Sequence, residues 1–425
     1  MRILILGINY FPERTSVSPF TTGLSEHLAA QGHSVRVVTA FPYYPEWRTW
    51  KEYRGRLTQF EVRNRVEIRR VLHFVPWRAS SLAERLLHDF SFAIAALIAG
   101  VASGPCDLVY CSSPPPAVAL AAYAVSRLRN APYIIKLTDL ASEAALATGI
   151  LRPGSLVRCA RFLERFAYRH AHTVVCLCDG FRSRLAGDGI PAEHLCRIPD
   201  WGDTESIRPV PGDGSFRAAN GIAGDEFVIL HTGNMGKKQH LLNVVRAAAL
   251  TRDEPKLRWV IVGEGEERGL IEEAARNADL PNFLVLPLQP AAGLCRMYAD
   301  ADLLLLNQRA AVKDAVIPSK LLTYMAAGKA VLCAASSASE AARVIGEAQC
   351  GQLVIPEDPR ALADAALRMQ ANRQGLQALG ANGRAYAENN FSRERVLRLY
   401  DAFFASFATP EHPAAAIAAD YGDSR

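Results

Sequence analysis

The sequence has no uninterrupted run of about 18 or more apolar residues, the length that a membrane-spanning helix needs. Residues Met1 to Gly7 enter a strand-like apolar run directly, without the charged region, apolar region and cleavage site of a signal peptide. We therefore expect a soluble globular protein that stays in the cytosol. Its 425 residues, half of them apolar, suffice for two domains with separate cores.

The sequence also lacks a C-x-x-C pair, although it contains nine cysteines. Several cysteines lie inside apolar runs, as in Val174 to Cys178. Such positions are typical of small buried side chains in a reducing compartment, and they argue against a disulfide framework or a zinc site. We expect neither a bound metal nor a cofactor.

Two familiar phosphate-binding loops are absent, because neither G-x-x-x-x-G-K-[ST] nor G-x-G-x-x-G occurs. The second half instead carries lysines on two short loops at the starts of helical patterns, Thr232-Gly-Asn-Met-Gly-Lys-Lys-Gln239 and Pro318-Ser-Lys-Leu-Leu-Thr-Tyr-Met-Ala-Ala-Gly-Lys329. A helix N-terminus offers unpaired N–H groups, and a nearby ammonium adds a full positive charge. Each loop alone fits a solvated surface lysine equally well, but two such loops in one half indicate a diphosphate site.

The net charge of +5 is modest, and it is concentrated in one stretch. Glu46 to Arg78 holds nine basic and four acidic residues, a surplus equal to that of the whole chain. Such a patch could face nucleic acid, anionic lipid or a phosphorylated substrate, or simply be solvated. It lacks helix-turn-helix, zinc and aromatic-stacking patterns, so nucleic acid is disfavoured as a partner.

A helical pattern follows the basic stretch. Its first half is amphipathic and basic, with apolar residues such as Leu86 and Leu87 interleaved with Arg78 and Arg85. A helix of this kind can lie on an anionic membrane surface, where each cation contributes about 1 kcal/mol. We expect peripheral membrane contact through residues 47–90, at the inner face of the membrane. For residues 90–103 we favour an ordinary buried helix.

Short runs rich in Val, Ile and Leu alternate with longer helical patterns in both halves. Their mostly continuous apolarity indicates strands that are covered on both faces, and hence parallel sheets of βα units. We predict an α/β fold of two Rossmann-like, doubly wound domains. The predicted strands are 2–6, 35–39, 66–72, 107–111, 133–137 and 173–177, then 227–231, 258–263, 283–287, 302–307, 330–334 and 352–356.

A segment rich in Pro and Gly, residues 209–214, interrupts this alternation and is the best linker candidate. We place an N-terminal domain at 1–205 and a C-terminal domain at 206–383, facing each other across a cleft at the carboxyl ends of their strands. An amphipathic, aromatic-rich helix at 384–408 should pack on another surface and can cross back to the first domain. The tail, 409–425, is predicted to be disordered.

Nearly the whole chain resembles the family 4 glycosyltransferases of the GT-B fold, in particular bacterial enzymes similar to colanic acid and O-antigen transferases. The resemblance lies in seven segments taken together, and only the two lysine segments would be specific by themselves. The segments are Ile8–Glu13, Phe41–Trp47, Asp139–Leu140, Ile198–Asp203, Thr232–Gln239, Val262–Gly265 and Pro318–Lys329.

The resemblance implies a glycosyltransferase of the hexosyltransferase type that is retaining and metal-independent. A nucleotide sugar would bind mainly to the C-terminal domain, and a lipid-linked saccharide or other glycan acceptor mainly to the N-terminal one. Lys238 and Lys320 would flank the diphosphate and stabilise the leaving group. The implied donor-binding residues are Gly233, Asn234, Lys238, Glu264, Asp314, Ser319, Lys320 and Thr323.

The first domain supplies the candidates for the acceptor side. Asp139 and Glu143 follow the predicted strand 133–137, where a carboxylate can position or deprotonate an acceptor hydroxyl. Asp139 suits the N-cap of a helix about as well. In the loop after the first strand, Ser16 and Ser18 occupy positions where the family often has glycine. The catalytic candidates are Lys238, Lys320 and Asp139, and we favour the two lysines over the carboxylate.

The sequence departs from the family at the E-x7-E pair of glutamates, where it has Ala315 and Thr323. The adjacent Asp314 could replace the first glutamate, and the Thr323 hydroxyl could bind a ribose more weakly than a carboxylate would. Two alternatives therefore stay open. One is a nucleotide-sugar epimerase or hydrolase of the same fold, and the other is a catalytically silent partner subunit.

Overall fold

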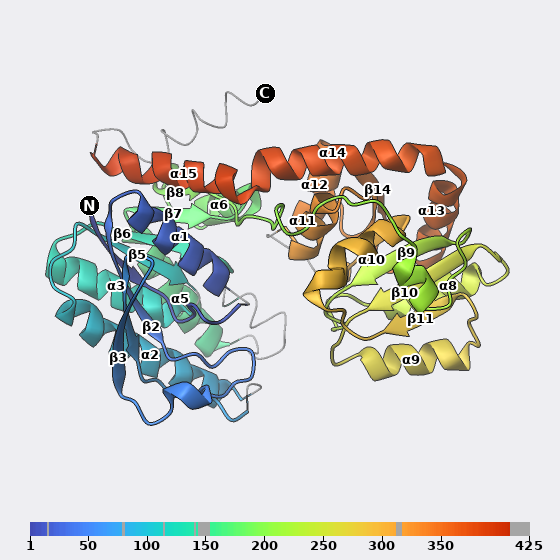
Figure 1. Ribbon diagram of the computed structural model, residues 1–425. Coiled ribbons are helices and arrows are strands. Elements are labelled where there is room, and N and C mark those ends of the chain that lie inside the picture. Colours follow the sequence, from blue (N-terminus) through green and yellow to red (C-terminus); the bar gives the residue numbers. More distant parts are fainter. Residues whose placement is uncertain are drawn as a thin grey trace. The chain divides into compact units, whose positions relative to one another are not determined.

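The structure is a computed structural model, and it describes residues 1–14, 17–78, 81–113, 115–139, 142, 154–311 and 317–408. The chain forms two compact units (Figure 1). Residues 1–200 and the C-terminal part from Leu397 make the first, and Trp201–Val396 make the second. Each unit is built on one largely parallel sheet with helices packed on it, which confirms the predicted α/β class with two Rossmann-like domains.

The sheet of the first unit has eight strands in the order β3-β4-β2-β1-β5-β6-β7-β8. The order reverses between β1 and β5, as in a doubly wound fold. The central strands β1, β5 and β6 are buried along almost their whole length. Their sequences are mostly apolar because both of their faces are covered. The strands are β1 (Arg2–Leu6), β2 (Ser34–Ala40), β3 (Thr58–Arg63), β4 (Val66–Val71), β5 (Leu108–Ser113), β6 (Tyr133–Leu137), β7 (Thr173–Cys176) and β8 (Leu195–Arg197).

Two of these strands were not predicted. β3 lies inside the basic stretch and pairs antiparallel with β4 at the edge of the sheet, with Thr58 opposite Val71 and Arg63 opposite Val66. Its side chains alternate between exposed and half-buried, so the stretch lacks the continuous apolar run by which the parallel strands were recognised. β8 is only three residues long. The basic stretch is therefore in part a β-hairpin.

Helices of the first unit connect and cover these strands. Helices α2, α3 and α5 pack successively on one another, while α1 packs on β2 and β4. The helices are α1 (Ser18–Ala30), η1 (Lys51–Tyr53), α2 (Leu82–Ala102), α3 (Pro116–Arg129), α5 (Ser155–Arg169), α6 (Asp179–Gly187) and η2 (Ala192–His194).

Helix α2 is more exposed than its apolar sequence suggests. Phe90, Ile94 and Ile98 project into solvent, so the prediction of an ordinary buried helix for residues 90–103 is wrong for this face. The opposite face is buried through Phe92, Ala96 and Gly100. In the described part of the chain, α2 is the one helix long and apolar enough to cross a membrane by length and composition, a test that a core helix also passes.

The sheet of the second unit has six parallel strands in the order β11-β10-β9-β12-β13-β14, which reverses between β9 and β12. The strands are β9 (Phe227–Thr232), β10 (Leu257–Val262), β11 (Phe283–Leu286), β12 (Leu303–Asn307), β13 (Val331–Ala334) and β14 (Gly351–Val354). The helices are α7 (Ser215–Ala219), α8 (Leu242–Leu250), α9 (Arg268–Asn277), η3 (Ala291–Gly293), α10 (Leu294–Asp300), α11 (Ser319–Ala326), α12 (Glu340–Ala348), α13 (Pro359–Ala371) and α14 (Arg373–Phe391).

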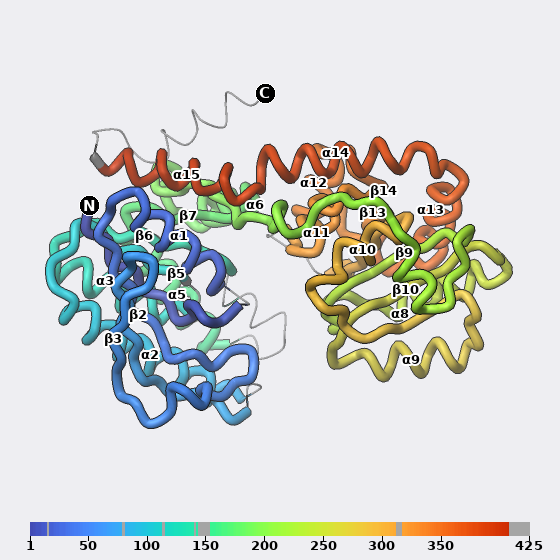
Figure 2. The backbone as a smooth tube through the Cα atoms, viewed as in Figure 1, coloured from blue at the N-terminus to red at the C-terminus, as the bar shows by residue number. Residues whose placement is uncertain are grey.

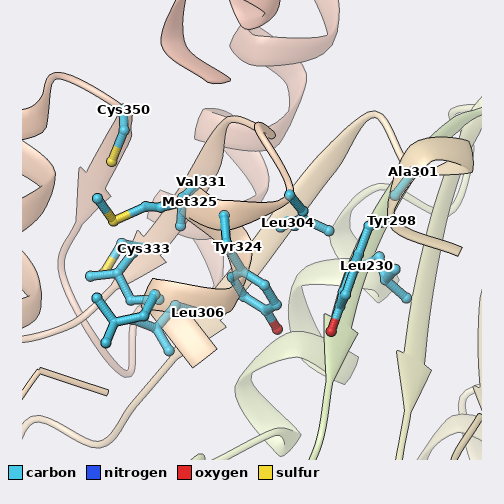
Figure 3. Packing of buried hydrophobic residues seen from close by; sticks show 14 of the residues in the cluster. Leu230, Tyr298, Ala301, Leu304, Leu306, Tyr324, Met325, Val331, Cys333 and Cys350 are labelled. Carbon is cyan, nitrogen blue, oxygen red and sulfur yellow. The ribbon is translucent and has the colours of Figure 1, made fainter. Parts of the chain in front are cut away.

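The core of the second unit brings α10 and α11 onto this sheet (Figure 3). Leu304 and Leu306 of β12 and Val331 of β13 belong to the same buried cluster as Tyr298 and Met325 of these helices. The tyrosine rings of Tyr298 and Tyr324 have centroids 6.2 Å apart, and Figure 3 shows their hydroxyl groups pointing the same way. Packing on a rigid sheet fixes the start of α11, where Lys320 lies.

The Pro- and Gly-rich segment that was predicted as a linker is bonded into the second unit. Asp300 accepts from the backbone N–H of Gly214 at 3.0 Å and of Phe216 at 2.9 Å. A Cβ on Gly212 would lie 2.9 Å from the same carboxylate. The connection between the units therefore falls earlier, between Asp200 and Trp201.

The described part of the second half closes with two helices where the sequence predicted one helix over 384–408. Helix α14 ends at Phe391, and α15 (Arg393–Ala405) begins after a break, followed by η4 (Ser406–Ala408). Ser392 is extended (φ −62°, ψ 148°), and its hydroxyl accepts from the N–H of Arg395 at 3.3 Å, which caps α15. Figure 2 shows the backbone of this turn. From Leu397 onward α15 belongs to the first unit. The last helix therefore crosses back to the first domain, as predicted.

Candidate functional site

The loop after β9 lies at the point where the strand order of the second unit reverses. Open parallel sheets bind ligands at such points, outside the carboxyl ends of the strands. The loop contains Gly233, Asn234 and Lys238, and the polar residues Asn307 and Arg309 end the neighbouring strand β12 and follow it. The first predicted lysine loop thus occupies the position at which this kind of sheet binds its ligand.

Close backbone contacts explain the glycines of this loop. Gly233 has φ +106° and donates its N–H to the Val262 carbonyl at 2.8 Å. A Cβ on Gly263 would lie 1.9 Å from the Gly233 carbonyl oxygen, and one on Gly265 would lie 2.4 Å from that of Met235. Only glycine allows these two backbone segments to approach so closely.

The second predicted lysine reaches this loop from α11. Lys320 Nζ donates to the Asn234 carbonyl at 3.2 Å and lies 3.0 Å from His231 Nε2. A Cβ on Gly233 would be 2.8 Å from Lys320 Cε, so the absence of a side chain there makes room for the lysine. Burial lowers the pKa of Lys320 to about 8. The structure therefore brings the two lysine loops together.

A tyrosine from the same motif links α11 to the end of β9. Tyr324 Oη accepts from the Thr232 N–H at 2.9 Å, and the Thr232 hydroxyl lies 3.2 Å from Tyr298 Oη. All three side chains are buried, where unpaired polar groups would be costly. This network fixes the position of Gly233 relative to Lys320.

Two further side chains that the sequence analysis missed hold the backbone around Lys238. Arg309 donates its side-chain Nε–H to the Lys237 carbonyl at 2.7 Å, and its backbone N–H donates to the Lys238 carbonyl at 2.9 Å. Asn307 Nδ2 donates to the Gln239 carbonyl at 2.7 Å. The sequence marks both residues by the polar run from Asn307 to Arg309, which begins at the last residue of the apolar strand β12. Lys238 itself has an exposed side chain.

The other predicted donor-binding residues have different surroundings. The Glu264 carboxylate pairs with Arg268, while the Glu264 carbonyl accepts from the Met235 N–H at 2.8 Å. Ser319 is exposed at the first turn of α11. Thr323 donates its hydroxyl to the Ser319 carbonyl at 3.1 Å, so it can offer a ligand only an acceptor oxygen. Asp314 lies outside the described residues.

In the first unit, Glu13 joins the loops that follow β1 and β2. Its buried carboxylate accepts from the N–H groups of Tyr43 and Tyr44 at 2.8 Å each and from Asn9 Nδ2 at 2.8 Å. Burial raises the pKa of Glu13, although these donors favour its charged form. The Glu13 carboxylate thus joins the motifs Ile8–Glu13 and Phe41–Trp47 through hydrogen bonds.

Ser18 has no free hydroxyl for an acceptor, in contrast to the prediction. It is fully buried at the start of α1 and donates to the Glu13 carbonyl at 2.7 Å. Asp139 is exposed just beyond the carboxyl end of β6. Ser16 and Glu143 lie outside the described residues.

A compact group of aromatic and imidazole rings lies near the same loops. His88 of α2 places Nδ1 2.7 Å from the Phe74 carbonyl and Nε2 3.2 Å from the Tyr43 hydroxyl. The His73 and His88 rings have centroids 4.8 Å apart. Burial lowers the pKa of both histidines, which are therefore neutral at pH 7. This group fixes α2 against the carboxyl ends of β2 and β4.

Comparison with family models covers most of the chain. Residues 16–201 match the model described as a glycosyl transferase 4-like domain. Residues 213–386 match the model of the glycosyl transferases group 1. The boundary between the two matches falls beside the division between the two structural units.

Curated relatives extend the match to nearly the full length. The chain is 31% identical over 420 residues to a putative colanic acid biosynthesis glycosyl transferase, WcaI, of Escherichia coli K12, covering 94% of this chain and 98% of the relative. It is 26% identical to the probable glycosyltransferase WbjE of Pseudomonas aeruginosa, covering 61% of this chain and 64% of the relative.

Solved structures share the fold at lower identity. Sucrose-phosphate synthase from Thermosynechococcus elongatus aligns with a TM-score of 0.74 and 18% identity, covering 95% of this chain and 99% of that one. Anabaena HepE in complex with UDP and glucose aligns with a TM-score of 0.68 and 16% identity, covering 96% and 100%.

Proposed function

This chain belongs to the GT-B glycosyltransferases of family 4, and on that premise we propose that it moves a sugar from a nucleoside-diphosphate sugar to a lipid-linked saccharide or similar glycan acceptor. The reaction serves polysaccharide biosynthesis, in keeping with the name of the Escherichia coli relative. The single observation that carries the donor assignment is the contact of Lys320 with the loop that bears Lys238. Two cationic segments at one strand-order reversal suit a diphosphate.

The proposed chemistry depends on leaving-group stabilisation. As the bond from the anomeric carbon to the diphosphate breaks, negative charge builds on the diphosphate oxygen, and fixed ammonium groups stabilise that charge. Lys238 and Lys320 supply this charge in our proposal, so the reaction needs neither a metal ion nor a cofactor. We propose retention at the anomeric carbon, with Asp139 orienting the acceptor hydroxyl from the first unit.

The absence of the E-x7-E glutamates leaves the ribose and donor sugar with weaker protein contacts. Thr323 presents an acceptor oxygen where the family has a carboxylate, because its proton is bonded to the Ser319 carbonyl. We propose that the lysine-bearing loops carry a larger share of donor affinity than in relatives with both glutamates. Donor binding should then be more sensitive to salt, since ionic contacts near the surface are screened.

A ligand panel tests the donor class. Melting temperatures are measured with UDP, GDP, ADP and dTDP, since a bound ligand stabilises the protein by RT ln(1 + [L]/Kd). We expect one nucleoside diphosphate to stabilise the wild-type protein, and to stabilise the Lys238→Ala variant much less. Product analysis with the matching nucleotide sugar then separates transfer from epimerisation and hydrolysis. Binding without any turnover would identify a silent subunit, and no stabilisation by any diphosphate would refute the donor site.

We further propose that the first unit contacts an anionic membrane at the cytosolic face, where a lipid-linked acceptor is reached. Ten of the seventeen large apolar side chains exposed in the described residues lie between Leu57 and Ile98. They come from the β3–β4 hairpin, the loop after it and α2, and they share this stretch with the basic surplus. Apolar side chains that enter the interface beside cations that attract anionic lipid suit such a surface.

Vesicle sedimentation tests the membrane proposal. The variant Ile94→Ser/Ile98→Ser should lose binding to vesicles that contain anionic phosphatidylglycerol, whereas Leu128→Ser should retain it. Leu128 is a matched control, since it is 68% exposed on α3 and Ile98 is 65% exposed. Wild-type binding should also weaken on zwitterionic vesicles and at high salt. Equal binding of both variants would rule out α2 as the contact surface.

A further inference from the structure

His231, a buried residue at the end of β9, accepts a hydrogen bond from Lys320, and we propose that it is the positioning residue that aims the Lys320 ammonium at the diphosphate. No sequence pattern marks His231, because a histidine inside an apolar strand is typical of a buried core residue. The inference rests on the proposed function for the identity of the ligand. The hydrogen bond between His231 and Lys320 does not depend on which ligand binds.

The hydrogen bonds around His231 fix its tautomer. Nδ1 lies 3.0 Å from the Leu305 carbonyl of β12, which can only accept, so Nδ1 carries the proton. Nε2 then presents a lone pair to Lys320 Nζ, 3.0 Å away. The side chain is fully buried, and burial with the nearby Lys320 charge keeps the pKa of His231 well below its ordinary value. His231 is therefore a neutral acceptor at pH 7.

This arrangement leaves Lys320 with one proton for a ligand. An ammonium has three N–H donors, of which one points to His231 Nε2 and one to the Asn234 carbonyl. Two fixed acceptors determine the direction of the third. Gly233 leaves room for the lysine stem in this position, because a Cβ there would lie 2.8 Å from Lys320 Cε. A cation fixed before the ligand arrives needs no reorganisation when charge develops on the leaving group.

Burial has a second consequence for the same group. It lowers the pKa of Lys320 to about 8, so the uncomplexed lysine loses its proton within a range that is open to experiment. A neutral imidazole that accepts a hydrogen bond favours the charged form of the lysine. An apolar ring in place of His231 should therefore lower the pKa of Lys320 further. An amide side chain that keeps the hydrogen bonds to the Leu305 carbonyl and to Lys320 should restore the pKa of Lys320.

The experiment compares His231→Phe with His231→Gln. The amide of His231→Gln can donate to the Leu305 carbonyl and accept from Lys320, whereas phenylalanine fills the space without either bond. The protonation of Lys320 is read from the pH dependence of its acylation by a small anhydride, followed by mass spectrometry of the lysine-bearing peptide. This measurement needs no donor and no activity. We expect the midpoint to fall in His231→Phe and to return towards the wild-type value in His231→Gln.

Steady-state kinetics supply the second measurement. His231→Phe should lower kcat at least tenfold and shift the alkaline limb of the kcat profile to lower pH, and His231→Gln should reverse most of both changes. In a Lys320→Met background, His231→Phe should have little further effect, because His231 acts through the lysine. Unchanged Lys320 acylation, or losses of kcat that simply add in the double variant, would overturn the proposal. Failure of the proposed function would appear differently, as a wild-type protein with the expected lysine midpoint but no transfer with any nucleotide sugar.

Discussion

Tyr110 and Tyr400 are 290 positions apart in the sequence, yet their hydroxyl oxygens lie 3.2 Å apart in the buried interior of the first unit. Tyr110 belongs to β5, and Tyr400 belongs to α15, which returns to this unit after the second one is complete. A few residues of α15 thus complete a core formed by the start of the chain.

This contact predicts a loss of stability in Tyr400→Phe. The change keeps the ring packed on Phe403, but it leaves the Tyr110 hydroxyl without its partner and removes the hydrogen bond between Tyr400 and the buried Lys136, at a cost of about 1–3 kcal/mol. The free energy of unfolding in urea measures the effect. Tyr123→Phe is the control, because the Tyr123 ring packs on Phe166 in the same unit. Equal stability of the two variants would mean that the hydroxyl contact contributes nothing.

Gly233→Ala should impair the donor site without unfolding the protein. The new methyl group would lie 2.8 Å from Lys320 Cε, and φ of +106° is unfavourable for alanine. We expect kcat to fall about tenfold or more because the ammonium is displaced, with a loss of stability of about 1–2 kcal/mol. Gly224→Ala is the matched control, since a Cβ there meets no atom within 4 Å. Similar kcat values for both variants would exclude a constraint at Gly233.

The adjacent lysines of the first loop should differ in function. Lys237 is 73% exposed and pairs at 3.8 Å with Glu266, so Lys237→Ala should change kcat/KM less than about fivefold. Lys238→Ala should lower it about 100-fold if that ammonium stabilises the leaving group. The two variants remove the same charge one position apart, which controls for net charge. A larger effect at Lys237 would reverse our assignment.

The sequence predicted the parallel strands well, because burial on both faces leaves a plain apolar run. β1 and β6 have the predicted bounds, and the other long strands differ by one or two residues at their ends. β3 was missed for the opposite reason, since apolar residues alternate with polar and charged ones in this edge strand and no continuous apolar run marks it. The break between α14 and α15 was missed because helical periodicity continues across Ser392, where one extended residue redirects the chain.

The residues of the candidate site stand out in the sequence, but the side chains that hold them in place do not. Gly233, Lys238 and Lys320 stand out because glycine and lysine at the start of a helix suit anions. His231 and Arg309 act on these residues through contacts that join positions 71 to 89 residues apart, and no local pattern reports such contacts. The same limit explains Ser18, whose burial follows from a bond to Glu13 that spacing alone does not predict.

The free energy of unfolding should depend on pH through Asp89 of α2, and replacing this carboxyl group by an amide should remove that dependence. Burial raises the pKa of Asp89 to about 7 in the folded protein from an ordinary value of 3.8, although the nearby Arg85 favours the charged form. The folded state therefore holds a proton that the unfolded state has lost between these two values, and this group's penalty grows as pH rises from about 4 to 7.

Asp89→Asn avoids this penalty, so the variant should be more stable than the wild type at pH 8. Its advantage should shrink steadily below pH 7 and become small near pH 4, because the carboxyl of the unfolded wild type then also begins to bind its proton. Urea unfolding midpoints of both proteins across this range measure the difference. Asp253→Asn in the turn after α8 is a suitable control, since that carboxylate is exposed. An advantage of Asp89→Asn that does not vary with pH would show that the amide acts by packing or hydrogen bonding rather than by removing a buried charge.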